Sequence, residues 1–187
     1  NGEDLNSRPD GSPSRWVIQM DERTEEEARS YPEVWRILEE RVKPERMTKD
    51  VKKYPRMVNE WWKFWNNRQE LARAIAGMER VMVTSRVTKH FTLSQCRADS
   101  IFSDATVVLA YDGYNYLALF LSSMFDQWSW QYSSKMDGRL RYSPSDCFEN
   151  FPFPPCLRPG HPLDEAERKS SAALERVGAA YYEHRAA

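Results

Sequence analysis

Two polar stretches of this sequence carry side chains that could hold nucleic acid. The first, residues 80–97, contains four arginine or lysine side chains and no carboxylate, although the formal net charge of the whole chain is −1. Such side chains donate hydrogen bonds to phosphate oxygens and to guanine acceptors in the major groove. On a strand, Arg86 would share a face with Thr88 and His90, and Lys89 would point the other way. A solvated strand edge guarded by charge is the more ordinary interpretation.

The second stretch, residues 131–142, offers lysine, arginine, aspartate, serine and glutamine side chains in a short span. These are the donor and acceptor types that distinguish base edges. Asp137 and Gly138 also form a common turn signal, and an ordinary turn is favoured from the residues alone. Arg139 and Arg141 alternate along the chain, so an extended backbone would place both on one face.

Two aromatic segments allow both a binding and a packing interpretation. Residues 151–155 read Phe-Pro-Phe-Pro-Pro and could be a polyproline ligand for a partner domain. An extended segment whose rings cover a neighbouring core is favoured. Residues 61–65 contain four aromatic side chains, which could stack on unpaired bases. So dense a cluster more often belongs to a core or to a seam between domains.

The helices and strands that carry these side chains are predicted to follow an α+β order: a helical N-terminal part, a central strand-rich block and C-terminal helices. Thr24 and Glu27 form a capping-box signature at the start of a helix over residues 25–42, which Pro32 divides into two. Asp164 is placed to cap a final helix. The other predicted helices cover residues 68–78, residues 116–132 after a strand-like start, and residues 144–150 capped by Ser143 or Ser145. The predicted strands cover residues 16–20, 81–84, 90–95, 105–110 and 139–142, and residues 1–15 are predicted to be a loop or linker.

Composition narrows the classes of function. The 187 residues, 41% of them hydrophobic, predict one domain or one domain with an appendage. Three scattered cysteines predict reduced thiols rather than a disulfide framework or a metal site. The sequence contains no HExxH pattern, Gly-x-Ser-x-Gly elbow or glycine-rich nucleotide loop, so we expect no catalytic, cofactor or metal site. No apolar run reaches the ~18 residues of a membrane span and no signal peptide opens the chain, which predicts a cytoplasmic protein without a membrane partner.

Several motifs, taken in their order along the chain, resemble the target recognition region of MmeI-like restriction–modification enzymes and related class I adenine-specific DNA methyltransferases. Each motif is modest alone, and their shared order is more specific. The resemblance covers residues 1–155. Its motifs lie at residues 1–5, 15–18, 31–32, 42–46, 61–62, 86–90, 141–144 and 147–154.

The resemblance implies a function in reading DNA. In that family this region recognises the DNA sequence, and a separate upstream domain binds S-adenosylmethionine and methylates adenine. Both polar stretches are therefore expected to contact DNA. The implied DNA-binding residues are Arg86, Thr88, Lys89, His90, Ser133, Ser134, Lys135, Asp137, Arg139 and Arg141.

The chain departs from the whole enzyme at the catalytic motif, which is Asn/Asp-Pro-Pro-aromatic. The Pro-Pro pair in this sequence follows Phe153, which cannot accept a hydrogen bond from the exocyclic amine of adenine. The glycine-rich cofactor loop is also missing. We therefore expect a fragment that neither binds S-adenosylmethionine nor methylates DNA, within a parent enzyme that does both.

The expected organisation places this fragment within a longer protein. Residues 1–23 are predicted to be a linker from an upstream methyltransferase domain, residues 24–155 the target recognition domain, and residues 156–187 a C-terminal helical extension. Both ends of the sequence favour an excised piece, because it starts without methionine and ends within a helical pattern. The expected partners are double-stranded DNA and the upstream domain. The alternative function is a protein–protein interaction module that uses the Phe-Pro and Trp-rich surfaces.

Overall fold

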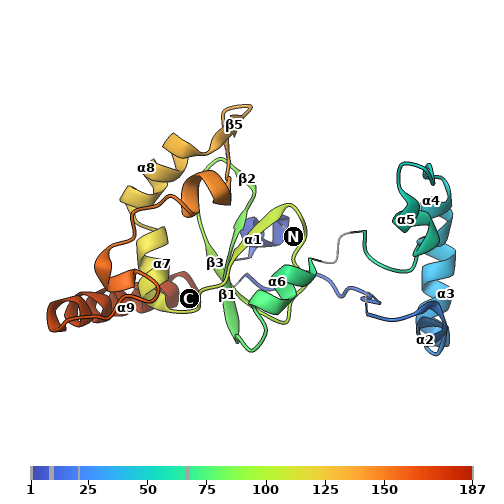
Figure 1. Ribbon diagram of the computed structural model, residues 1–187, viewed down its shortest axis with the longest axis horizontal. Coiled ribbons are helices and arrows are strands. Elements are labelled where there is room, and N and C mark those ends of the chain that lie inside the picture. The colour runs from blue at the N-terminus through green and yellow to red at the C-terminus, as the bar shows by residue number, and fades with distance from the viewer. Residues whose placement is uncertain (1, 9–10, 21, 66–67, 187) are drawn as a thin grey trace. The chain divides into compact units, whose positions relative to one another are not determined.

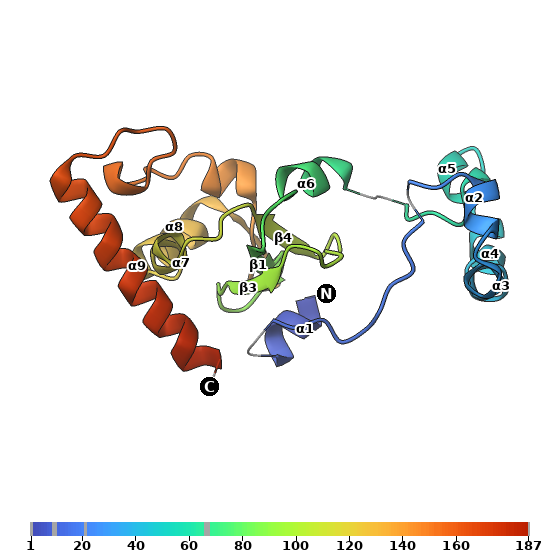
Figure 2. The same cartoon turned by 90° about the horizontal axis from the view of Figure 1, so that it is seen from below.

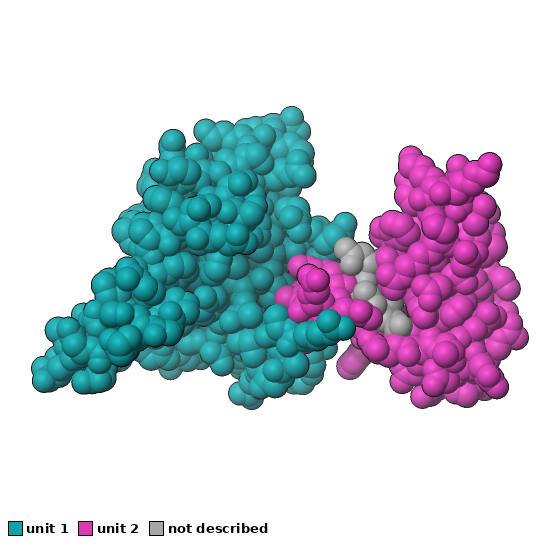
Figure 3. All heavy atoms as spheres, viewed as in Figure 1, with its two compact units in different colours: residues 1–14, 73–187 teal, residues 15–72 magenta. Residues whose placement is uncertain are grey.

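The computed structural model describes residues 2–8, 11–20, 22–65 and 68–186. The chain divides into a larger unit of residues 1–14 and 73–187 and a smaller unit, here called the helical unit, of residues 15–72 (Figure 3). Among the described residues, helices come first, four strands follow, and the later helices flank a hairpin of two further strands; the two sheets are antiparallel, which confirms the predicted α+β class. Four residues of the predicted linker lie outside the described residues: Asn1, Pro9, Asp10 and Asp21. Asn1 also belongs to the first motif. Ala187, the last residue of the chain, lies outside the described residues as well.

The first sheet is built on a buried central strand. β1 (Arg80–Ser85) pairs antiparallel with β3 (Ser94–Arg97) on one side and with β4 (Thr106–Leu109) on the other. Every residue of β1 after Arg80 is buried, so the strand is covered on both faces. The predicted strands at residues 81–84 and 105–110 are confirmed in position.

The predicted strand at residues 90–95 is wrong for its first half. Residues 90–93 form no strand, and β3 begins only at Ser94. The apolar signal at Phe91 has another origin, because its ring packs against Phe125 and Tyr142 at centroid distances of 5.5 and 5.0 Å. Core packing therefore produced a pattern that resembles a strand.

The second sheet is smaller and has the strand order β2-β6-β5. β2 (Val87–Thr88) and β5 (Ser134–Met136) both pair antiparallel with the middle strand, β6 (Arg139–Arg141). A single residue, Arg86, separates β2 from β1, so the chain passes directly from the first sheet into the second (Figure 1). The predicted strand at residues 139–142 is confirmed.

Three longer helices support the sheets of the larger unit. They are α7 (Tyr114–Phe120), α8 (Ser123–Tyr132) and α9 (Glu165–Ala186). α9 runs alongside α7, and this close approach requires Gly178, because a Cβ there would lie 1.9 Å from the carbonyl oxygen of Tyr114 (Figure 2). Asp164 caps α9 as predicted, since its Oδ1 accepts a hydrogen bond of 2.8 Å from the Glu167 amide. The strand-like start predicted at Tyr116 is wrong, because residue 116 lies inside α7, whose Leu117 and Phe120 face the core one helical turn apart.

Residues 151–155 form part of the core of the larger unit. Phe151 is buried, and its ring lies 4.8 Å from Phe125 and 5.3 Å from Phe153 between centroids. Phe153 also meets Phe120 and Phe148 edge to face. The packing interpretation of the Phe-Pro run is confirmed. The neighbouring predicted helix at residues 144–150 is a short π-helix, η1 (Pro144–Phe148), without a side-chain cap, and a 3₁₀ turn, η2 (Pro155–Leu157), follows the run.

Two predictions near the start of the chain are wrong. Gly2–Ser7 forms helix α1 instead of a loop, and its Leu5 is buried beside the first sheet. Residues 16–20 form no strand: no strand of the described residues pairs with them, and Trp16 is fully exposed. Short apolar runs near a chain end carry too little periodicity to separate these states.

The helical unit is built from short helices around a small core. They are α2 (Glu25–Arg29), α3 (Pro32–Arg41), α4 (Lys43–Met47) and α5 (Pro55–Asn59), and α6 (Gln69–Ala74) follows at the boundary of the unit in the sequence. Pro32 stands at the first position of α3, so the predicted division of the long helix is confirmed. The core contains the predicted aromatic cluster in part, since Trp61 is buried against Trp35 while Trp65 is exposed. The predicted helix at residues 68–78 is confirmed over α6 only.

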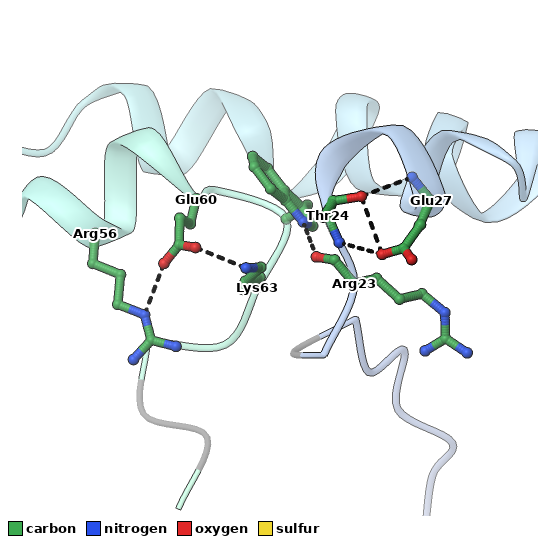
Figure 4. A network of polar contacts seen from close by, with 7 residues as sticks. Arg23, Thr24, Glu27, Arg56, Glu60 and Lys63 are labelled. Carbon is green, nitrogen blue, oxygen red and sulfur yellow. Dashed lines mark hydrogen bonds and ion pairs between the residues drawn. The ribbon is translucent and has the colours of Figure 1, made fainter. Parts of the chain in front are cut away.

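Polar contacts link the start of α2 to the segment that follows α5 (Figure 4). Thr24 and Glu27 form the predicted capping box, in which each side chain accepts a hydrogen bond from the other residue's backbone amide. The indole Nε1 of Trp62 donates a bond of 3.3 Å to the carbonyl of Arg23 and ties two distant segments together. Lys63 donates a hydrogen bond of 2.7 Å to the Glu60 carboxylate, and Arg56 donates to the same carboxylate. These two bonds, that of Lys63 first, hold the pKa of Glu60 below its ordinary value.

Candidate nucleic-acid interface

The most exposed part of the second sheet is the hairpin of β5 and β6. The strands are joined by the two residues Asp137 and Gly138, with φ values of 51° and 70°. Positive φ at both central positions is the mark of a type I′ turn, whose twist matches that of the paired strands. The turn predicted at these residues is therefore present, and it forms the tip of a two-stranded ribbon.

Side chains alternate strictly along β6. Leu140 and Tyr142 are almost completely buried in the core of the larger unit, whereas Arg139 and Arg141 are exposed. Burial also raises the pKa of the Tyr142 phenol, so this ring stays neutral in the core. The predicted arrangement of the two arginines on one face is confirmed. We call the face that carries them, opposite to Leu140, the outer face of the sheet.

The register of the sheet identifies the other residues of the outer face. Directly paired residues share a face, so Ser134 and Val87 join Arg141, and Met136 joins Arg139. Ser134 and Met136 are exposed. Met136 was missed by the sequence analysis, although its position could have been found, because a two-residue turn fixes which residues pair across it.

Two predicted residues occupy the opposite face in register. Thr88 and Lys135 both pair with the buried Leu140. Thr88 is half-buried, and its hydroxyl donates a hydrogen bond of 2.7 Å to the carbonyl of His90, which closes the turn after β2. Lys135 lies on the edge strand and stays exposed.

The end of β2 brings Lys89 and His90 to the tip of the hairpin. Because β2 runs antiparallel to β6, the residues that follow Thr88 lie at the end of the sheet that carries Asp137 and Gly138. Both side chains are exposed. The two polar stretches of the sequence therefore meet in space at one end of a single small sheet.

The polar side-chain atoms of two predicted residues form hydrogen bonds within the fold. Ser133 is buried, and its hydroxyl accepts a hydrogen bond of 3.3 Å from the backbone amide of Ser143. Arg86 is half-buried; its Nε donates to the carbonyl of Asp104 at 2.8 Å, and its own carbonyl accepts from the Tyr142 amide at 2.8 Å. The Ser133 bond links the start of β5 to the end of β6, and the Arg86 bonds link the junction of β1 and β2 to the end of β6 and to the segment before β4. A role of either residue in DNA contact stays a prediction.

The charge of this region is strongly positive. Residues 86–90 and 133–141 together carry five arginine or lysine side chains and one carboxylate, Asp137, in a chain of net charge −1. Asp137 lies 3.6 Å from Arg139 between carboxylate and guanidinium, with both side chains at least half exposed. Exposed pairs of this kind contribute at most about 1 kcal/mol, so Arg139 can exchange this partner for another anion at little cost.

The residue before the Pro-Pro pair lies in the aromatic core of the larger unit. Phe153, which precedes the Pro-Pro pair, is packed among aromatic rings and offers adenine no hydrogen-bond acceptor. Across residues 2–8, 11–20, 22–65 and 68–186, no group of three His, Cys, Asp or Glu side chains could hold a metal ion. In the same residues, no helix is both long enough and apolar enough to cross a membrane.

Comparison with known proteins identifies the type of domain. The sequence matches the family described as "MmeI, target recognition domain" over residues 11–155. A solved structure described as the type IIL restriction–modification enzyme MmeI in complex with DNA has the same fold, with a TM-score of 0.65 at 18% sequence identity. The match covers 91% of this chain and 21% of that chain, so this chain spans about a fifth of that protein's length. No curated protein matches the sequence.

Proposed function

We propose that this chain, which belongs to the MmeI target recognition domain family, reads the base sequence of double-stranded DNA through the outer face of its β2-β6-β5 sheet. One observation carries the proposal: Arg139 and Arg141 stand side by side on an exposed ribbon whose intervening residue, Leu140, is fully buried. In this role the chain binds and orients the duplex, so that a catalytic domain elsewhere in the parent protein can flip and modify a base.

The dimensions of the ribbon suit the major groove of B-DNA. That groove is ~12 Å wide and admits a two-stranded β-ribbon. Residues two apart on a strand are separated by roughly 6.6 Å along its axis. This spacing is close to two base-pair steps of about 3.4 Å each. Arg139 and Arg141 could therefore address guanines two base pairs apart, with neighbouring side chains of the outer face beside them.

Arginine is the residue type that this task favours. Its planar guanidinium donates two parallel hydrogen bonds to the O6 and N7 atoms of guanine, and each such pair discriminates against a wrong base by ~1–3 kcal/mol. The discrimination depends on a fixed side-chain origin. Leu140 and Tyr142 provide it, because their burial in the core leaves β6 little freedom to shift.

The remaining steps of the reaction belong, in this proposal, to other parts of the parent protein. An upstream methyltransferase domain would bind S-adenosylmethionine and methylate adenine in the cytoplasm. This chain carries out no methyl transfer itself, because Phe153 occupies the position where the catalytic motif needs an acceptor. What it contributes is the choice of the site and the placement of the duplex.

The test uses the full-length protein that contains this chain and a pool of random DNA duplexes. Bound duplexes are recovered and sequenced, and methylated adenines are mapped as a second readout. We expect Arg139→Ala with Arg141→Ala to lose discrimination at one or two base pairs, by about tenfold to a hundredfold at each.

A matched variant, Arg168→Ala with Arg176→Ala, removes the same charge from exposed positions on α9. It should select the wild-type sequence. Base reading by the outer face would be refuted if the Arg139 and Arg141 variant also selected the wild-type sequence.

A further inference from the structure

We propose that the helical unit carries a second DNA-binding surface, formed by residues 41–56, which holds phosphates without reading bases. This inference rests on the proposed function, because DNA is taken as the ligand of the chain. It concerns a different unit of the molecule and a different kind of contact. We call residues 41–56 the basic segment; it contains α4, the start of α5 and the turn between them.

Charge is sharply segregated along the helical unit. The basic segment holds seven arginine or lysine side chains and two carboxylates. Residues 22–40, which precede it, hold three cations and seven carboxylates. The helical unit therefore does not present evenly mixed charges, which is what an ordinary solvated surface would show.

Ion pairs within the unit neutralise only part of the basic segment. Lys43 pairs with Glu39, Lys49 with Glu45, and Arg56 with Glu60, each four residues apart in the sequence. The other four cations of the segment form no ion pair with a described residue. These cations are Arg41, Arg46, Lys52 and Lys53.

Cations that are packed against the core can be set apart from those that face solvent. The ammonium group of Lys43 lies 4.9 Å from the ring centroid of Trp61, so this lysine covers the core of the unit. Arg46 is half-buried, and its Nη1 is buried without a hydrogen-bond partner among the described residues. Lys52 and Lys53 are exposed, and the ammonium of Lys53 also lies 5.2 Å from the ring centroid of the neighbouring Tyr54, which is only half-buried.

The turn between α4 and α5 fixes the backbone beneath these lysines. Asp50 accepts a bond of 2.9 Å from the amide of Lys52 through its Oδ1, and its carbonyl accepts from the amides of Lys53 and Tyr54. The carboxylate is thus engaged with the backbone. Lys52 and Lys53 project as adjacent positive charges from a defined turn.

Lysine is better suited to phosphate than to base reading at such a position. Its ammonium is a point charge on a flexible stem, which can follow a row of phosphates but fixes no planar pair of hydrogen bonds. A polyanion of regular charge spacing complements a run of cations of this kind, and duplex DNA carries a charge every ~1.7 Å of its axis. We therefore assign this surface to the DNA backbone.

The experiment measures the salt dependence of DNA binding by the 187-residue chain. A fluorescent duplex of random sequence is titrated at several salt concentrations, and binding is followed by anisotropy. Each phosphate contact contributes about 0.9 to the slope of log K against log salt, so Lys52→Ala with Lys53→Ala should lower the slope by about 1.8. Lys52→Arg with Lys53→Arg should retain it.

The outcomes separate the two proposals. The charge-matched variant Arg168→Ala with Arg176→Ala should keep the wild-type slope. If the Lys52 and Lys53 variant behaves like that control while the Arg139 and Arg141 variant loses sequence discrimination, the second surface is refuted and base reading stands. If the lysine variant instead loses binding to an acidic protein but not to DNA, the assignment of the ligand is wrong. Absence of any DNA binding by the wild-type chain would overturn the inference as well.

Discussion

The β2-β6-β5 sheet and the helical unit both carry dense positive charge, but they hold it in different ways. In the sheet, arginines alternate with residues buried in the core of the larger unit. In the helical unit, lysines project from a turn between the short helices α4 and α5. The backbone is fixed in both regions, but the sheet presents planar guanidinium groups, whereas the turn presents lysine ammonium groups that act as point charges.

This difference matches two kinds of DNA contact. Reading a base requires a side chain held within a fraction of an ångström, since a displaced guanidinium loses one of its two hydrogen bonds. Holding a phosphate requires charge near the backbone and tolerates movement. The buried anchors of the outer face and the exposed lysines of the basic segment would thus divide specificity and affinity between the two units.

The largest effect is expected from removing the anchor of the sheet. Leu140→Ala deletes a fully buried side chain between the two arginines, and such changes cost about 2–5 kcal/mol of the free energy of unfolding. Urea unfolding of the chain measures this loss. Met136→Ala, on the exposed side of the same hairpin, should change stability by less than about 0.5 kcal/mol. Equal losses in the two variants would contradict the proposed anchoring of β6.

A smaller effect is expected from straining the hairpin turn. Gly138 has φ +70°, and a Cβ added at this position would have no atom within 4 Å, so Gly138→Ala introduces backbone strain without a clash. A non-glycine residue in this conformation costs roughly 1–2 kcal/mol. We expect this loss of stability together with weaker DNA binding, measured by urea unfolding and anisotropy.

Gly77 supplies a control of the same chemistry outside the sheet. It has φ +83° and equally open surroundings. Gly77→Ala should lose comparable stability and retain wild-type DNA binding. Weaker DNA binding in both variants would show that binding follows overall stability and not the shape of the hairpin.

The smallest effect is expected at the start of the helical unit. Thr24→Ala removes the capping box of α2 and should cost about 1 kcal/mol locally. Hydrogen exchange of the peptide over residues 24–31 should become faster, while the selected DNA sequence stays the same. The exposed hydroxyl of Ser30 donates a hydrogen bond to the Glu27 carbonyl. Ser30→Ala should therefore speed up hydrogen exchange less than Thr24→Ala does. A changed DNA sequence in the Thr24 variant would contradict the division of roles.

The capping box also predicts a pH dependence of this protection. The hydrogen bond from the Thr24 backbone lowers the pKa of Glu27 below its ordinary value of 4.5. A carboxylate whose pKa is lower in the folded than in the unfolded state stabilises the folded state at pH values above its unfolded-state pKa. That contribution is lost as the pH falls through its folded-state pKa. Protection of residues 24–31 should therefore decrease on acidification below about pH 4.5, and less so in Thr24→Ala.

Local patterns in the sequence were sufficient for several elements. The capping box at Thr24, the division at Pro32 and the turn at Asp137–Gly138 each depend on neighbouring residues, and each follows from the sequence without knowledge of the fold. The strand predictions at residues 16–20 and 90–93 were wrong for different physical reasons. The apolar run at residues 16–20 is largely exposed, with Trp16 fully so, and therefore does not record burial of the run. At residues 90–93, burial of Phe91 against aromatic rings looks the same in the sequence as burial in a sheet.

From the amino-acid sequence alone it follows that two polar stretches are rich in cations and that Arg139 and Arg141 lie on one side of an extended chain, because side-chain alternation is a local property of the backbone. Which other predicted residues accompany the two arginines depends on the fold. β2 contains two residues and pairs with a strand about fifty positions away, so no local pattern could give its register. That register places Ser134 and Met136 beside the arginines and Thr88 behind them, and packing buries Ser133. Long-range pairing and burial sort side chains in ways that neighbouring residues cannot specify.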